Sequence, residues 1–503
     1  MDRSGFPLRQ LHHMAMSGQS QVPLTGRMKT RHSRRGLSRA MWKGGLRDMT
    51  EQGSSLTERL AVQLQRPVDA AARERAAALV VDWLGCALGA LRYPLAAQLT
   101  ALVETLPAGE ATALAAGRHD PASALLLNAA LGNVLEMDDV HRGAILHPGP
   151  VVIPLALAAC EASGAGATQL LDAVVRGYET TIRIGRALGV GHYRYWHPTS
   201  TAGAFGAAAA AVSVLGRDAE TTADALGTAG SRTGGLWQMR HEAVPTKSIH
   251  NAEAARSGWL AAQLAAAGVP GPRYILEGPQ GLFAAMATDV RPEQVTAAEP
   301  DWLIHSTSLK PWPACRHVHP SIDALLDLAP QLAGLQDDKI VRIDVATYAD
   351  ALRFCDKPRP SSEAEAKFSL QHALAAVLVH GRPLLAHYAM SSVDDSAIVA
   401  LRERVFVKED AGCSARFPTH YGATIQVRLH NGKLLESKRV DAWGDPECPM
   451  DEAAVADKAF ALAEWGGVPR ALAATLFDAI HALPSGGSLA PLRAALTEIR
   501  RCG

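Results

Sequence analysis

The spacing of hydrophobic residues predicts helices throughout the first half of the chain. Apolar residues, many of them Ala, recur with a helical period, and Pro or Gly interrupts each run. The run Gly268-Val-Pro-Gly-Pro marks a clear stop. The predicted helices before that stop lie at 68–91, 121–135, 151–162, 167–188, 199–215, 219–227 and 252–267.

The pattern changes after Pro330, where hydrophobic and polar residues begin to alternate. Residues 339–348 and 423–429 both alternate, which is typical of strands. The pair Asn431-Gly432 follows the second run and is a strong signal for a hairpin. The first strand is expected to place three residues on one face: Val341, Ile343 and Val345.

A helix is expected between the two strands, at 364–379, and helical spacing returns from Asp451. This order predicts a mainly α fold, in which a large all-helical domain carries an inserted, smaller α+β domain. The predicted boundaries are 1–54 for a basic N-terminal extension, 55–325 for the helical domain, 326–440 for the α+β domain and 441–503 for C-terminal helices that return to the helical domain.

Composition supports a helical protein and narrows its chemistry. Of 503 residues, 48% are hydrophobic and 5% aromatic, and Ala, the best helix former, makes up much of the balance. Lys plus Arg equals Asp plus Glu, 50 against 50, so the chain lacks the broad basic surface that nucleic-acid binding needs. The longest uncharged run of small residues, 202–216, is too short to span a membrane. Seven Cys without CxxC spacing argue against a disulfide scaffold, so we expect a cytoplasmic protein. From the charge balance and the short apolar runs we expect neither nucleic acid nor a membrane as partner.

The first fifty residues differ from the rest in charge. Ten basic residues face only Asp2 and Asp48, and no apolar stretch follows that would make a secretory signal. We expect a disordered tail or an upstream start codon, with Met28, Met41 or Met49 as the true start, and a transit-like segment is the alternative. Without this segment the rest of the chain is mildly acidic.

The first candidate for chemistry is the stretch 136–149, which lies between two apolar runs. A connection between buried helices tends to line a cleft, although acids after a helix can also form a solvated loop. The stretch holds three acids and two histidines: Glu136, Asp138, Asp139, His141 and His147.

Three further stretches place a basic residue just before a predicted helix. His197 precedes Pro198, with Thr199 or Ser200 as the cap, and Lys247 precedes an Ala-rich helix. A helix that begins with small residues lets an anion approach its free N–H groups, and a bound anion would also explain a Lys at this end of the dipole. His197 could instead only cap or pack, and Lys247 could lie on the surface.

The stretch 310–320 is the most basic of the four and precedes a helix that is expected to start at Pro320. Its Cys and His spacing matches no zinc-site pattern. Dinucleotide, Walker, HExxH and GxSxG motifs do not occur in the sequence. We therefore expect helix ends to converge on a small anionic polycarboxylate, with contributions here from Lys310, Arg316 and His319.

At these positions the sequence resembles the MmgE/PrpD family. The resemblance runs from about residue 56 to residue 463, and the order of the motifs is specific to the family. The matching motifs are Asp138-Asp139 with His147-Pro148-Gly149, His197-Pro-Thr-Ser, Thr246-Lys247-Ser-x-His250, Lys310-x-x-Pro-x-Cys315-Arg316-x-x-His319-Pro320 and Lys367-Phe-Ser-Leu-Gln371.

The resemblance implies a helical domain with a smaller lid domain, a homodimer, and chemistry on di- or tricarboxylates that needs neither cofactor nor metal. Three departures from the usual pattern weaken an assignment to the 2-methylcitrate dehydratases of the family. Val140 stands where Thr is frequent, and Glu136 stands where Asp is frequent. The pair His141-Arg142 stands where the citrate-type dehydratases usually have other residues. The active-site positions implied by the resemblance are Glu136 or Asp138, His147, His197, Lys247 and Lys310.

We predict a hydro-lyase that acts on a hydroxy-polycarboxylate such as a 2-methylcitrate-like acid. A base removes the proton α to a carboxylate, three cations (Lys247, Lys310 and Arg316) stabilise the enolate-like dianion, and His147 or His197 protonates the departing hydroxyl. An epimerase or isomerase of the iminodisuccinate type, a decarboxylase of the cis-aconitate type and a non-catalytic carboxylate-binding protein stay open as alternatives. Catalytic roles are predicted for Asp138, His147, His197 and Lys247, and substrate contacts for Glu136, Asp139, His141, Lys310, Arg316 and His319.

Overall fold

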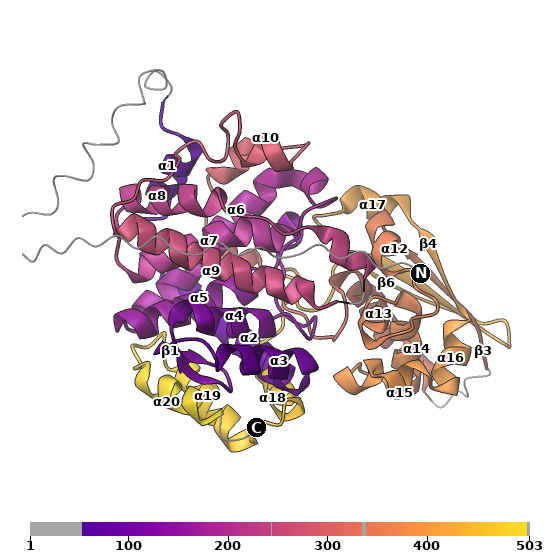
Figure 1. The fold of residues 1–503 in the computed structure, drawn as a ribbon. Coiled ribbons are helices and arrows are strands. Elements are labelled where there is room, and N and C mark those ends of the chain that lie inside the picture. The colour runs from indigo at the N-terminus through magenta and orange to yellow at the C-terminus, as the bar shows by residue number, and fades with distance from the viewer. Residues whose placement is uncertain (1–52, 243, 334–338, 500–503) are drawn as a thin grey trace, which may run out of the picture. The chain divides into compact units, whose positions relative to one another are not determined.

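The computed structural model describes residues 53–242, 244–333 and 339–499, which belong to one unit that runs from residue 51 to residue 503. The basic extension predicted over 1–54 lies outside the described residues, apart from its last two. Within the described ranges the chain forms twenty α-helices and six β-strands, whose arrangement is drawn in Figure 1.

Helix α7 lies at the centre of the helical region and packs against α5, α6, α8 and α9. Almost all of its residues are buried, and its Ala-rich sequence lets neighbouring backbones approach closely. A Cβ placed on Gly258 of α9, for example, would lie 2.3 Å from the Cβ of Ala207. The helices of this region are α1 Leu56–Gln63, α2 Ala70–Gly89, α3 Pro94–Val103, α4 Pro121–Leu131, α5 Gly149–Ser163, α6 Ala167–His192, α7 Pro198–Val214, α8 Ala219–Gly230, α9 Thr246–Ala266 and α10 Leu282–Met286.

Two helix starts differ from the sequence prediction. The prediction that Thr199 or Ser200 caps α7 was wrong, because His197 is the N-cap residue and Pro198 takes the first helical position. Helix α9 begins at Thr246, six residues earlier than predicted, because its polar first turns hid the start. The side chain of Lys247 therefore leaves from inside the first turn of α9.

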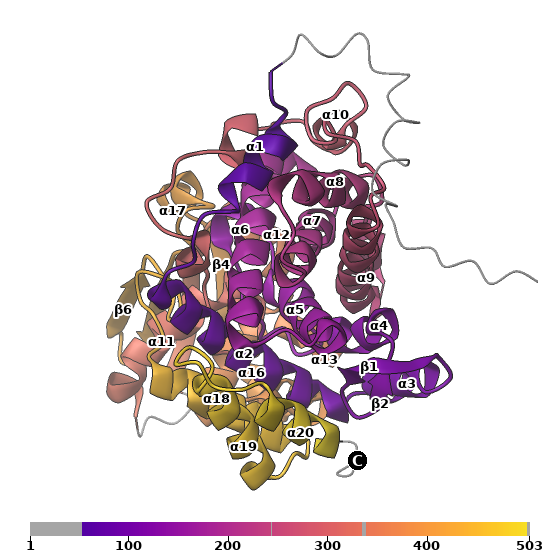
Figure 2. The ribbon, with the colours of Figure 1, turned by 90° about the vertical axis from the view of Figure 1, so that its left-hand side faces the viewer.

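The C-terminal helices complete the core of the helical region. One hydrophobic core combines buried residues from 56–309 with residues from 450–499, and α18 packs directly on α2. Figures 1 and 2 show these helices, in yellow, beside the indigo helix α2. They are α18 Glu452–Trp465, α19 Arg470–His481 and α20 Ala490–Glu498.

Residues 312–435 form a second hydrophobic core around a four-stranded sheet. The strand order is β4-β3-β5-β6, with β3 parallel to β4 and antiparallel to β5. The predicted hairpin is the antiparallel pair β5–β6. The elements of this region are α11 His319–Leu332, β3 Ile340–Thr347, α12 Ala349–Cys355, α13 Glu363–Lys367, α14 Leu370–His380, α15 Met390–Val393, α16 Ser396–Arg402, β4 Val405–Glu409, α17 Ala411–Arg416, β5 Ala423–Leu429 and β6 Leu434–Arg439.

Local irregularities explain where the predicted elements were inaccurate. Val341 is 47% exposed instead of sharing the buried face of β3, because the pairing with β5 shifts between Ile340 and Arg342. The helix predicted over 364–379 is two helices, since α13 ends with Phe368 as its C-cap and the side chain of Ser369 caps α14 by accepting the N–H of His372. The strands β1 (Ala108–Ala113), β2 (Gly117–His119) and β4 escaped prediction, because β2 and β4 are short and β1 consists largely of Ala and Gly, which are uncommon in strands.

The mainly α class is confirmed, whereas the insertion of a lid domain and the predicted domain boundaries stay predictions. Among the described helices none alone has the length and apolar character to cross a bilayer. Two consecutive helical segments, Ala70–Arg92 and Pro94–Val103, have that length and apolar character only when they are taken together, and the chain bends by 94° between them.

Candidate active site

The loop between α4 and α5 carries the first polar stretch and is held at two points. Glu136 has a φ of 58°, a left-handed backbone that few residues other than Gly adopt. Oδ2 of Asp138 accepts a hydrogen bond from Nδ2 of Asn133 at 2.7 Å. The carbonyl oxygen of Met137 accepts one from Nζ of Lys458 at 2.6 Å, so a C-terminal helix supports this loop.

Two lysines from distant segments converge on Glu136. Nζ of Lys247 donates to Oε1 of Glu136, and Nζ of Lys310 lies 3.1 Å from the carbonyl oxygen and 3.6 Å from Oε2 of the same residue. A bridge between Val140 and Ser308 brings the segment of Lys310 to the loop. Burial alone would raise the pKa of Glu136, but the two ammonium groups hold it below its ordinary value.

Asp138 and His147 form an acid–imidazole pair beside the lysines. Nδ1 of His147 lies 3.0 Å from Oδ2 of Asp138 and 2.7 Å from the carbonyl oxygen of Asp139. Burial would raise the pKa of Asp138, but His147 and Lys310 lower it, so this carboxylate is ionised. With two acceptors at Nδ1, the ring carries its proton there and presents Nε2 for proton transfer.

His197 is the third member of the cluster and is uncharged. It is 1% exposed, its ring packs on Trp237 at 4.5 Å between centroids, and its Nε2 is buried with no hydrogen-bond partner among the described residues. Nδ1 of His197 lies 3.3 Å from Nδ1 of His250. Burial, with Lys247 next in effect, holds the pKa of His197 well below its usual range.

Hydrogen bonds join the starts of three helices at this cluster. The N–H of His147, just before α5, donates to Oγ1 of Thr199 in the first turn of α7 at 3.1 Å. Oγ of Ser200 donates to the carbonyl oxygen of His250 in α9 at 3.3 Å. The predicted convergence of helix ends therefore occurs for α5, α7 and α9.

Two other residues of the loop turn away from the lysines. Oδ1 of Asp139 accepts the N–H of Gly149 at 3.0 Å, and burial together with the charge of Asp138 raises its pKa to about 7. His141 accepts the N–H of Ala144 at Nδ1, and its Nε2 lies 3.1 Å from Oγ of Ser306. Their predicted substrate contacts stay predictions, because both side chains already have partners within the protein.

Arg316 and His319 also have partners outside the lysine cluster. Nη2 of Arg316 lies 2.5 Å from Oδ1 of Asp445, and Nη1 donates to the carbonyl oxygens of Leu309 and Trp443. Nδ1 of His319 lies 3.2 Å from that guanidinium, and its Nε2 lies 3.0 Å from the carbonyl oxygen of Ala314. Lys310, from the segment before α11, reaches Glu136 and Asp138, whereas the substrate contacts predicted for Arg316 and His319 stay predictions.

Three side chains of the described residues lie close enough to share a metal ion: His420, Asp441 and Glu447. Arg142 already donates to both carboxylates, at 2.7 Å to Asp441 and 2.6 Å to Glu447. A cation at this position would have to compete with a guanidinium that satisfies the negative charge.

The cluster can hold an anion and move protons. It contains two cations and two imidazoles, and solvent reaches part of it, since the side chains of Glu136, His147 and Lys247 are 12, 16 and 20% exposed. Lys247 and Lys310 would stabilise negative charge on a bound carboxylate, because ammonium groups in a water-poor site act strongly.

Sequence reasoning did not select three residues that complete the site. His250 lies in a recognised motif, three residues after Lys247. This spacing on a helix places the two side chains next to each other and could have indicated that His250 belongs to the site. Lys458 lies on the buried stripe of α18 beside Val455 and Ala459, and such a position signals a buried charge that needs a partner. Asn133 gave no signal, because one amide at the end of an apolar helix has no distinguishing pattern.

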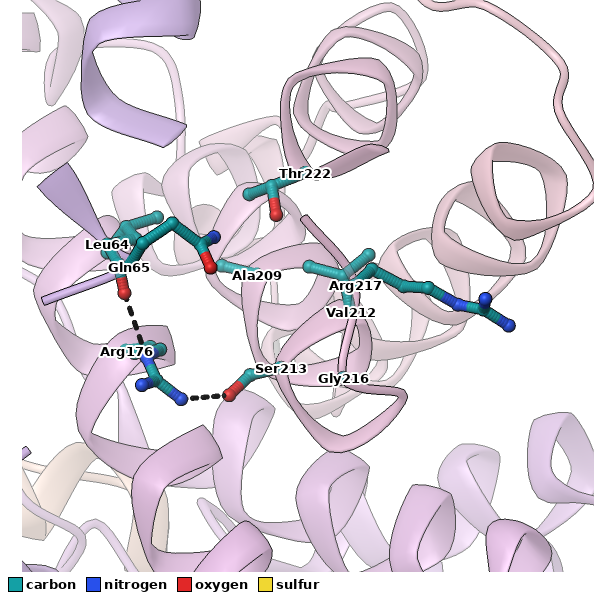
Figure 3. A pocket seen from close by; sticks show the side chains of 9 residues that line it. All are labelled: Leu64, Gln65, Arg176, Ala209, Val212, Ser213, Gly216, Arg217 and Thr222. Carbon is teal, nitrogen blue, oxygen red and sulfur yellow. Dashed lines mark hydrogen bonds between the residues drawn. The ribbon is translucent and has the colours of Figure 1, made fainter. Parts of the chain in front are cut away.

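Two cavities lie outside the lysine cluster. One of about 700 Å³ has His250 in its wall and is lined further by residues of α7, α9 and the loop between α8 and α9. The other, of about 240 Å³, is drawn in Figure 3, where Arg176 points to Ser213, to which it donates at 2.7 Å, and Arg217 points outward. None of the predicted site residues lines this second cavity, so we assign it no role.

Comparison with known families covers most of the chain. The profile of the MmgE/PrpD N-terminal domain matches residues 60–295, and that of the MmgE/PrpD C-terminal domain matches residues 312–475. The chain belongs to the MmgE/PrpD family. The resemblance seen in the sequence motifs is thereby confirmed, and the cluster described above lies mainly within the segment matched by the N-terminal profile.

Several known proteins resemble this chain at low identity. The "Cis-aconitate decarboxylase-like protein oryM" of Aspergillus oryzae (strain ATCC 42149 / RIB 40) is 28% identical over 407 residues, which is 75% of this chain and 84% of the relative. The cis-aconitate decarboxylase of Homo sapiens is 27% identical over 363 residues, 68% of this chain and 72% of the relative. The mitochondrial 2-methylcitrate dehydratase of Yarrowia lipolytica (strain CLIB 122 / E 150) is 28% identical over 137 residues, 26% of each protein.

Proposed function

We propose that this MmgE/PrpD protein is a lyase that acts on a small di- or tricarboxylate through an enolate-like intermediate, without a cofactor. The observation that carries the proposal is the convergence of Lys247 and Lys310 on one carboxylate, that of Glu136, in a largely buried site. A substrate carboxylate has the same charge and shape as that side chain. Two ammonium groups placed for a carboxylate would also stabilise the second negative charge that an enolate adds.

Of the two lyase outcomes, we place decarboxylation of a cis-aconitate-like acid first. In this step the bond from carbon to the departing carboxylate breaks and CO2 leaves. Its electron pair stays on the substrate as an enolate conjugated with a remaining carboxylate, and a proton then adds to carbon. The relatives that cover most of the chain carry this activity in their names, which favours it over dehydration.

Dehydration of a hydroxy-polycarboxylate, the outcome predicted from the sequence, is the second candidate. It needs a base for the α proton and an acid for the hydroxyl that leaves as water. The imidazoles of His147 and His197 lie in one cluster and could supply both functions. The 2-methylcitrate dehydratase relative favours this outcome, although it matches a quarter of the chain.

The test is turnover of candidate acids followed by proton NMR in D2O. The panel contains cis-aconitate, citrate, 2-methylcitrate and iminodisuccinate. We expect cis-aconitate or a close analogue to release CO2 and to gain one deuterium at carbon. Formation of an alkene from a hydroxy acid would favour dehydration instead, and exchange of the α proton without either product would indicate an epimerase. If the folded protein turns over none of these acids, the proposal is wrong.

The predicted homodimer and the cytoplasmic location belong to the same proposal. Light scattering of the purified protein tests the first, and fractionation of cells tests the second.

A further inference from the structure

We propose that His250 is a proton-relay residue. It exchanges protons between the buried imidazole of His197 and the cavity of about 700 Å³. The inference rests on the proposed function, because it assigns a route for the proton that the lyase reaction needs. His250 contacts no reacting atom in this account, so it is a positioning residue that acts through His197.

The contact between the two rings fixes where their protons lie. Nδ1 of His197 and Nδ1 of His250 are 3.3 Å apart, and the ring centroids are 5.5 Å apart. Burial lowers the pKa of both rings, so both are neutral in the free protein. A hydrogen bond between two neutral imidazoles requires that one Nδ1 carries a proton and the other does not.

The position of that proton determines what the far nitrogen of His197 can do. If His250 donates, the proton of His197 lies on Nε2 and the ring is an acid at that atom. If His197 donates, its Nε2 has a free lone pair and the ring is a base. Because Nε2 of His197 is buried with no partner among the described residues, its state depends chiefly on the contact with His250.

The surroundings leave His250 as the route to solvent. His197 is 1% exposed and its ring is covered by Trp237, whereas His250 is partly exposed and lines the cavity together with Ser200 and Thr246. When the Nε2 proton of His197 leaves, the Nδ1 proton of His250 moves to Nδ1 of His197, and Nε2 of His250 takes a proton from solvent in the cavity, so that both rings end neutral.

Charged groups around the pair oppose a permanent positive charge on it. The charges of Lys247 on α9 and of His147 on the loop disfavour an imidazolium at His197, and Asp138 favours one. Three charged residues line the same cavity as His250: Arg232, Glu242 and Glu253. A ring pair that is neutral at rest and charged briefly suits a relay rather than an anion-binding site.

The first experiment needs no substrate, so it separates a failure of this inference from a failure of the proposed function. Long-range nitrogen–proton NMR of the full chain reports the tautomer of each ring, with His197→Gln and His250→Gln used to assign the signals. We expect one ring of the pair to carry its proton on Nδ1. Two rings that both carry the proton on Nε2 would overturn the inference.

The second experiment is chemical rescue of His250→Ala. We expect kcat to fall about 100-fold, the lower range for a positioned proton-transfer group, while circular dichroism shows the native helix content. Imidazole is small enough for the cavity. Adding it should raise the kcat of His250→Ala about tenfold, and the increase should level off at high imidazole concentration. Met239→Ala, which enlarges the same cavity and keeps both imidazoles, should leave kcat unchanged with and without imidazole.

Retention of kcat in His250→Ala would overturn the inference. So would a loss that imidazole does not reverse in a variant that keeps its helix content. If His250→Ala does not fold, His250→Asn, which keeps a polar side chain, is tested for loss of kcat in its place.

Discussion

Lys310 and Arg316 lie six residues apart in one segment, but their charges serve different parts of the molecule. Lys310 reaches Glu136 and Asp138 in the solvent-accessible cluster. Arg316 ends against Asp445, a fully buried carboxylate more than a hundred residues later in the sequence. The comparison teaches that a basic residue beside a helix start is not yet a ligand for substrate, because a distant internal acid can take the charge first.

The largest effect is expected on stability, when the buried ion pair between Arg316 and Asp445 is broken. Arg316→Met leaves the buried carboxylate of Asp445 without its closest cation and should lower the free energy of unfolding by about 3–5 kcal/mol. Urea denaturation measures this change. The matched control is Arg439→Met, which breaks a half-exposed pair with Asp327 and should cost at most about 1 kcal/mol.

Turnover of the same variant sharpens the comparison further. The fraction of Arg316→Met that stays folded should keep the kcat of the unaltered protein. A large loss of kcat at unchanged stability would contradict the structural assignment and support the substrate role that the sequence predicted.

Next in size is the effect of removing a cation from the cluster. Lys247→Ala should lower kcat by about 10²–10³-fold, or roughly 2.7–4 kcal/mol of barrier, if the ammonium group acts like a donor to an oxyanion. His147→Ala should also lose turnover and keep the fold. Steady-state rates measure both, and Arg256→Ala, an exposed position on the same helix α9, serves as control. Unchanged kcat in both cluster variants would show that the site is misassigned.

A smaller, pH-dependent effect is expected at Asp139, which turns away from the lysines. Its pKa of about 7 in the folded state lies far above the ordinary value of 3.8. Between these two values the unfolded chain has lost the proton and the folded chain retains it, so the free energy of unfolding falls as pH rises. The slope from one proton is about 1.4 kcal/mol per pH unit. Asp139→Asn should remove this slope from urea titrations at pH 5, 6 and 7, and parallel curves for the two proteins would contradict it.

The smallest effect is expected from removal of metal ions. Because Arg142 pairs with Asp441 and Glu447, chelation with EDTA should change neither the melting temperature nor kcat. A loss that returns on addition of a divalent metal would show that the cluster with His420 holds an ion. It would also show that Arg142, Asp441 and Glu447 have a role in function, as Lys310 is expected to have, and not only in holding the structure.

Much of the fold could be predicted from the sequence because period and breaks are local properties. The five helices predicted between 68 and 215 and the hairpin after residue 423 were located within a few residues, whereas α3 (Pro94–Val103) was not located. Val341 was misplaced because a shift in strand pairing depends on the neighbouring strand, which a single segment does not reveal.

The candidate site could be predicted only in part. Motifs identified Lys247, Lys310, His147 and His197, which the fold brings into one cluster. They could not separate these residues from Arg316 or His319, because that distinction depends on Asp445 and on carbonyl oxygens presented by the fold. Lys458 escaped notice because its partners lie on the loop before α5 and on α2.

The hydrogen bond from Lys458 to the carbonyl oxygen of Met137 also has a consequence for synthesis of the chain. Nζ of Lys458 lies 2.6 Å from Oδ1 of Asp82, which is 1% exposed, and the same ammonium group supports the loop that carries Glu136 and Asp138. During translation, Asp82 and this loop leave the ribosome more than three hundred residues before their common partner. The loop that carries Glu136 and Asp138 therefore gains this support only after almost the entire polypeptide has been made.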